Sequence, residues 1–90
     1  MNREKLKTIA QKTIDDIESE KNYDFIARLM EESLRKETEF DGEYVQIEVD
    51  AVIQEKRPLR VRVRAFADDG GFLNAVSPQG ASTVIEFQDV

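Results

Sequence analysis

The sequence predicts an α+β domain in which two N-terminal helices pack on one face of a four-stranded antiparallel meander sheet, giving two layers. Apolar residues recur at spacings of three and four up to about residue 36, whereas apolar and polar residues alternate from residue 44 to residue 67. Asp-Gly, Gly-Gly and Ser-Pro pairs, which favour turns, divide the segments that follow. Ninety residues are enough for one domain. We therefore expect residues 1–90 to fold as a unit, with a helical hairpin at 2–37 and the sheet at 43–89.

The first helix is predicted over residues 3–21, with Asn2 as its N-cap. Its apolar side chains are spaced to form one stripe, which comprises Leu6, Ile9, Ala10, Thr13, Ile14 and Ile17. The basic residues of this helix lie early and the acidic residues late, which is the reverse of what the helix dipole favours. We therefore expect a neighbour to compensate, either the acidic end of the second helix or an antiparallel copy of the first helix across a dimer axis.

The second helix is predicted from a cap at Asn22 or Asp24 to about residue 36. Its apolar face consists of Phe25, Ile26, Leu29, Met30 and Leu34. Residues 40–43, with the sequence Phe-Asp-Gly-Glu, break the helical period, and we expect the sheet to begin directly after them.

Two long strands are predicted at residues 44–54 and 59–67, joined by a turn at 55–58. In both strands the apolar side chains occupy odd positions, so the odd face should lie against the helices. The remaining predicted elements are a turn at 68–71, a short strand at 72–76, a turn at 77–80 and a last strand at 83–88.

The composition removes most routes to enzyme and metal chemistry. The chain has no cysteine and no histidine, and therefore no thiolate nucleophile, disulfide, imidazole base or zinc site built from these residues. The Asp-Asp-Gly-Gly segment at 68–71 lacks the ligand spacing of an EF-hand calcium loop. The carboxylates of Glu48 and Asp50 share a face, but arginines on the next strand would keep both ionised. We expect no metal, no cofactor and no enzymatic activity.

Charge and hydropathy indicate the compartment and exclude some partners. The net charge is −6 at pH 7, which disfavours binding to nucleic acid or to anionic lipid. No run approaches the roughly 20 apolar residues that a membrane span needs, and residues 1–7 are highly charged. We expect a cytoplasmic protein that associates neither with membranes nor with nucleic acid.

The most visible candidate site is a basic cluster, defined here as Lys56, Arg57, Arg60, Arg62 and Arg64. Arg60, Arg62 and Arg64 alternate along one strand and so share one face of the sheet. They could bind the phosphate or carboxylate groups of an anionic ligand or of a nucleic-acid segment. Alternatively, Glu48 and Asp50 on the preceding strand pair with them, because the short turn brings Asp50 opposite Arg62 or Arg64. We favour the ion-pair interpretation.

The same face carries apolar side chains that helices on the other face cannot cover, namely Tyr44, Val52, Phe66 and Val84. Aromatic residues and arginine are typical of interface centres, although scattered apolar side chains on a surface are equally ordinary. The long hairpin should also extend beyond the helices, unless a bulge folds its tip back. We therefore expect a non-enzymatic protein-interaction module, acting as a homodimer or as an accessory subunit. The alternative is a binder of anions or nucleic acid through Arg57, Arg60, Arg62 and Arg64.

Overall fold

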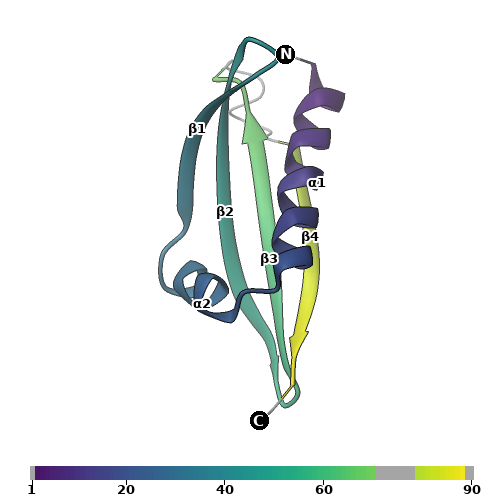
Figure 1. Ribbon diagram of the computed structural model, residues 1–90, viewed down its shortest axis with the longest axis vertical. Coiled ribbons are helices and arrows are strands. Elements are labelled where there is room, and N and C mark those ends of the chain that lie inside the picture. Colours follow the sequence, from purple (N-terminus) through teal and green to yellow (C-terminus); the bar gives the residue numbers. More distant parts are fainter. Residues whose placement is uncertain (1, 71–78, 89–90) are drawn as a thin grey trace.

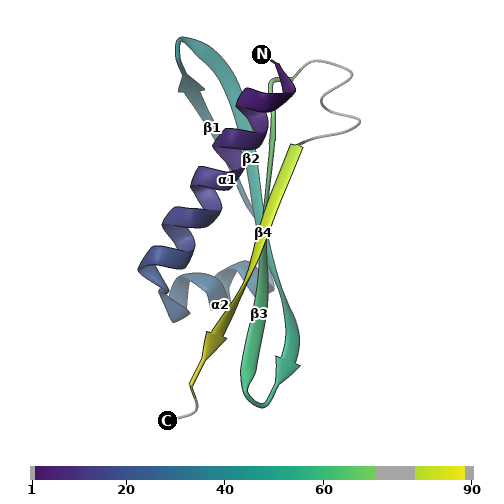
Figure 2. The same ribbon diagram turned by 90° about the vertical axis from the view of Figure 1, so that its right-hand side faces the viewer.

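The computed structural model describes residues 2–70 and 79–88, which form two helices and four strands. The elements in chain order are α1 (Arg3–Glu20), α2 (Tyr23–Glu31), β1 (Leu34–Phe40), β2 (Glu43–Lys56), β3 (Leu59–Asp68) and β4 (Gln79–Phe87). The strands form one antiparallel meander in the order β1-β2-β3-β4, and both helices lie on the same side of it (Figures 1 and 2). This architecture confirms the predicted α+β class.

The core lies between the helices and the odd-numbered residues of β2 and β3. Helix α1 begins at the predicted cap, where Asn2 Oδ1 accepts a hydrogen bond from the Lys5 backbone N–H at 2.8 Å. It packs on β3 and β4, whereas α2 packs on β2. The buried side chains of the sheet are Val45, Ile47, Val49, Ala51, Val61, Val63, Ala65, Ala67 and Ile85. Among residues 2–70 and 79–88 no helix covers the other side of the sheet (Figure 2), and its even-numbered positions on β2 and β3 are exposed or half-buried.

The predicted second helix is wrong beyond residue 31. Helix α2 ends at Glu31, and residues 34–40 form β1, which pairs with β2 from Leu34 opposite Val49 to Phe40 opposite Glu43. The two residues between these strands, Asp41 and Gly42, have positive φ angles of 52° and 76°. Two such residues match the twist of a tight hairpin, so backbone pairing with β2 overrides the helix propensity of a charged segment.

The helical hairpin expected at 2–37 is therefore absent. Helix α2 crosses the sheet beside the C-terminal end of α1 instead of running back along it (Figures 1 and 2). An acidic end of the second helix consequently does not lie near the basic start of α1. Leu34, which was assigned to the apolar face of that helix, is instead 43% exposed on β1.

The other differences concern the later strands. The strand predicted at 72–76 lies outside the described residues. The last strand begins at Gln79 instead of residue 83, and it pairs directly with β3, from Ala67 opposite Gln79 to Leu59 opposite Phe87.

The β2–β3 hairpin and the end of β4 extend past both helices, as predicted (Figures 1 and 2). The molecule is 44 Å long, whereas the 18 residues of α1 span only about 27 Å. The register of β2 against β3 shifts between Ile53 and Glu55, so a bulge is present as well. The strands nevertheless stay paired to Lys56 opposite Leu59, and the tip does not fold back.

Candidate functional site

The open face of the sheet is built from rows of side chains that run across β2, β3 and β4. Antiparallel pairing sets each row by register. From the projecting end inward, the rows are Glu55–Arg60–Glu86, Val52–Arg62–Val84, Asp50–Arg64–Ser82 and Glu48–Phe66–Gly80. Three arginines of the basic cluster therefore occupy the central strand, each with different neighbours.

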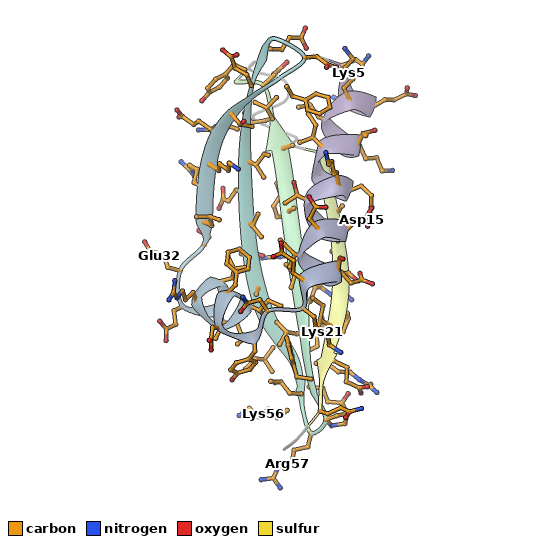
Figure 3. The ribbon with its side chains drawn as sticks, viewed as in Figure 1. Lys5, Asp15, Lys21, Glu32, Lys56 and Arg57 are labelled. Carbon is orange, nitrogen blue, oxygen red and sulfur yellow. The ribbon has the colours of Figure 1, made fainter. Side chains whose placement is uncertain are left out.

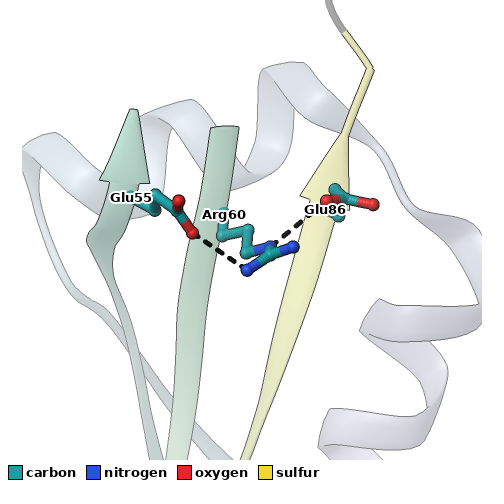
Figure 4. Close-up of polar contacts among 3 residues, drawn as sticks. All are labelled: Glu55, Arg60 and Glu86. Carbon is teal, nitrogen blue, oxygen red and sulfur yellow. Dashed lines mark hydrogen bonds and ion pairs between the residues drawn. The ribbon is translucent and has the colours of Figure 1, made fainter. Parts of the chain in front are cut away.

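Arg60 and Arg64 are both neutralised by carboxylates of adjacent strands. Arg60 lies between two glutamates, with Nη1 2.9 Å from Glu55 Oε2 and Nε 3.2 Å from Glu86 Oε1 (Figure 4). Arg64 donates two hydrogen bonds of 2.7 Å to the two carboxylate oxygens of Asp50. These hydrogen bonds and the negative charge of Asp50 raise the pKa of Arg64 above its ordinary value. The predicted pairing of Asp50 with an arginine of β3 is thus confirmed.

The predicted pairing of Glu48 with the same arginines is wrong. Glu48 stands opposite Phe66 on β3, and its Oε2 lies 3.3 Å from Nη2 of Arg35 on β1 instead. The ion pair of Glu48 with Arg35 could not be predicted from the sequence, because Arg35 was assigned to a helix.

Arg62 has no ion pair with any residue of 2–70 or 79–88. Its Nη1 donates a hydrogen bond of 3.0 Å to Ser82 Oγ, and its neighbours in the row are Val52 and Val84, which are 50% and 40% exposed. Arg57 and Lys56 lie at the tip of the hairpin, away from this row (Figure 3). The basic cluster is therefore not a continuous cationic surface.

The four predicted interface residues do not form one patch. Val52 and Val84 flank Arg62, about 10 Å apart across two strand spacings. Phe66 lies about 13 Å further along β3, with its ring 5.7 Å from the Arg64 guanidinium carbon. Tyr44 lies at the opposite end of β2, about 26 Å from Val52. Charged rows separate these sites.

Tyr44 belongs to a polar environment shared with β1. Although its side chain is 45% exposed, partial desolvation raises the pKa of its phenol, and a hydrogen bond to Glu37 and the negative charges of Glu37 and Asp68 act in the same direction. The phenol is therefore held neutral and hydrogen-bonded, which does not suit it for acid–base work near neutral pH.

The projecting end carries apolar side chains on its helix side as well as on its open side. Ile53 is 44% exposed and Tyr23 is 51% exposed. The Tyr23 ring meets the Phe87 ring edge to face, with centroids 5.3 Å apart. Sequence analysis missed Tyr23, because nothing at the start of a helix indicates that it will lie beside the last strand.

The described part of the chain has neither a cluster of metal ligands nor a helix that could span a membrane. Residues 2–70 and 79–88 contain no group of three or more acidic side chains placed to hold a metal ion. Neither α1 nor α2 is long and apolar enough to cross a membrane. Comparison of the chain with models of known protein families, with curated proteins and with solved structures gives no match.

Proposed function

We propose that the protein is a small non-enzymatic interaction module, acting as a homodimer or as an accessory subunit, that binds another protein through the apolar end of its sheet. The apolar end is defined as Val52, Ile53, Val84 and Tyr23. The supporting observation is that the described residues include six exposed large apolar side chains, and four of them lie at this end. Val52 and Val84 lie on the open side and Ile53 and Tyr23 on the helix side, so a partner that holds this end of the sheet from both sides would cover all four.

Arg62 gives the apolar end its polar specificity. It lies between the two exposed valines and makes a single neutral hydrogen bond, to Ser82. A partner that covers Val52 and Val84 would also exclude water from this guanidinium, whose remaining N–H groups would then favour a carboxylate. Arginine surrounded by apolar contact area is a common arrangement in the residues that dominate binding energy. The expected partner surface is therefore apolar with an acidic group near its centre.

A charge placed within the apolar end should weaken partner binding. Val52→Glu would place a carboxylate opposite Arg62 and so neutralise the guanidinium that faces the partner, and we expect affinity for the partner to fall at least about tenfold, equivalent to about 1.4 kcal/mol. The matched control is Lys36→Glu, an exposed position of β1 away from this end of the sheet. Proteins retained by the immobilised wild type and the control, but not by Val52→Glu, are quantified by mass spectrometry. Equal retention by all three chains would contradict the proposal.

The alternative function, capture of an anionic ligand or a nucleic-acid segment, takes second place because Arg60 and Arg64 are already paired with carboxylates. We expect no submillimolar affinity for heparin or a single-stranded oligonucleotide in titrations at physiological salt. Steep weakening with salt is the mark of phosphate contacts. Submillimolar, salt-sensitive binding that disappears in the Arg60/Arg62/Arg64 triple alanine variant would instead support the alternative.

A further inference from the structure

The two outer strands of the described sheet differ sharply in charge. Strand β1 carries four charged side chains among its seven residues, which are Arg35, Lys36, Glu37 and Glu39. Residues 79–85 of β4, with the sequence Gln-Gly-Ala-Ser-Thr-Val-Ile, carry none. Charged side chains on an edge strand disfavour pairing with another chain, and uncharged β-branched residues permit it. Strand β4 is therefore the edge suited to accept a further strand.

We propose that a second copy of this chain pairs its own β4 antiparallel to this β4 about a two-fold axis, forming one eight-stranded sheet with all four helices on one face. The inference rests on the proposed function because it assumes that the protein acts as a homodimer. It adds an interface that uses Val84 and leaves Val52, Ile53 and Tyr23 of each copy free for another protein.

The first argument is the charge pattern of α1 on the side that faces β4. Thr83 Oγ1 donates a hydrogen bond of 2.6 Å to Glu18 Oε2, which places Glu18 beside the β4 edge. Figure 3 also shows Asp15, one turn earlier, on the side of α1 away from β1. Helical spacings of three and four extend the stripe of Glu18 along the helix. Its exposed members are Glu4, Lys7, Gln11, Glu18 and the C-cap residue Lys21, whereas Ile14 at the same spacing is buried against the sheet.

This stripe is complementary to itself when reversed. In an antiparallel pair of α1 helices, Glu4 meets Lys21 of the second copy and Lys7 meets Glu18 of the second copy, with Gln11 of each copy near the axis. Both opposite-charge contacts therefore occur twice, once on each side of the axis. The arrangement also supplies the compensation that the reversed charge polarity of α1 requires, which α2 cannot supply from beside the C-terminal end of α1 (Figure 1).

The second argument is the spacing. Helix α1 packs on both β3 and β4, so its axis lies over these two strands. Continuing the sheet through β4 places the two copies of α1 two strand spacings apart, about 10 Å. The axes of packed helices lie about 8–10 Å apart. Because α1 and β4 run in the same direction along the molecule, antiparallel β4 strands make the two helices antiparallel as well (Figures 1 and 2).

The third argument concerns the side chains that would meet on the open face of the sheet. Thr83 lies beside Glu18, and the middle of the α1 stripe lies about 8 Å toward the start of α1, within about two strand residues of Ser82. An axis at Ser82 places Gly80 opposite Val84 of the second copy. A Cβ on Gly80 would lie 2.9 Å from the Phe66 ring, so the ring occupies that space and would contact the incoming valine. Exposed Val84 and half-buried Phe66 would then cover each other.

Disulfide trapping tests the interface directly, because the chain has no cysteine of its own. A residue on the axis faces its own copy with Cα atoms about 4.5–5.5 Å apart, within reach of a disulfide. We expect Ser82→Cys to give a covalent dimer under mild oxidation, and the matched control Glu37→Cys, in the middle of β1, to remain monomeric. Equally fast cross-linking of the two variants, or none by Ser82→Cys, would overturn the proposal.

Charge complementation tests the helix pairing. Lys7→Glu and Glu18→Lys should each weaken self-association at least about tenfold in sedimentation equilibrium, because each creates two like-charge contacts. Mixing the two variants should restore a heterodimer in which both contacts are again opposite in sign. Lys12→Glu, which lies off the stripe, is the control. Failure of the mixture to associate more tightly than either variant alone would contradict the pairing, as would a 10.4 kDa monomer at every concentration of the wild type.

The outcomes separate this inference from the proposed function. Loss of partner binding by Val52→Glu in a chain that stays monomeric would leave the proposed function standing and reject the β4 interface. Disulfide trapping at Ser82, together with partner binding that is insensitive to Val52→Glu, would support the β4 interface and reject the apolar end as the contact surface.

Discussion

Replacing Val63 by aspartate is expected to abolish the cooperative thermal unfolding of the domain, leaving an unfolded chain. Val63 is fully buried at the centre of β3, between Ala51 of β2 and Thr83 of β4, in the layer that α1 covers. A carboxylate there has no cationic partner within the core, and its burial costs several kcal/mol beyond the lost packing of the valine. A domain of this size is stable by only about 5–14 kcal/mol.

The matched control is Val52→Asp, the same substitution on the neighbouring strand at a side chain that is 50% exposed on the open face. It should change the free energy of unfolding by about 1 kcal/mol or less. Circular dichroism during thermal and urea unfolding measures both variants. Similar melting temperatures for the two variants would contradict the assignment of the Val63 face of the sheet as the face that the helices cover.

Truncating Ile14 to alanine is expected to destabilise the domain by about 2–5 kcal/mol. Ile14 is fully buried in the middle of α1, above β3 and β4, so the removed atoms leave a cavity that the rigid sheet below cannot fill. For a chain of this length, that loss lowers the melting temperature by about 10 °C or more.

Lys12→Ala is the control for this second change, because Lys12 is an exposed residue of the same helix and alanine has a high helix propensity. Urea denaturation followed by helix circular dichroism should separate the two variants clearly. A loss below about 1 kcal/mol for Ile14→Ala would indicate that α1 is only loosely attached to the sheet.

The two central strands, β2 and β3, were predictable because each has one buried face and one accessible face. Alternation of apolar and polar residues carries the strand period and the identity of the buried face together. The odd positions from Val45 to Ala51 and from Val61 to Ala67 are buried, as expected. The pairing of Asp50 with Arg62 or Arg64 was predicted from a turn at 55–58, and the observed register selects Arg64.

Strand β1 could not be recognised from its own residues. Its segment, Leu-Arg-Lys-Glu-Thr-Glu-Phe, is rich in good helix formers and lies at a sheet edge where neither face is deeply buried. The Asp41-Gly42 pair was the available indication, since Asp-Gly between two extended segments favours a two-residue hairpin. It was interpreted only as the end of a helix.

The details of the site depended on registers that alternation does not determine. The bulge between Ile53 and Glu55 turns Glu55 onto the open face, where it reaches Arg60. The partners supplied by β4, Glu86 and Ser82, depend on the position of a strand whose predicted start was four residues late. Which arginine stays unpaired therefore could not be known before the strands were aligned.

The extension of the sheet past its helical cover has a consequence for local opening. Amide hydrogen exchange reports how often each backbone hydrogen bond breaks, and bonds above a packed core break least. Residues beneath α1 share the core, whereas the end of the β2–β3 hairpin extends past both helices and is held by strand pairing and by the ion pairs of Arg60 with Glu55 and Glu86 (Figure 4). The same three strands should therefore open from their outer end first. A partner that covers this end would slow exchange there most, and part of its binding free energy would be used to order that end.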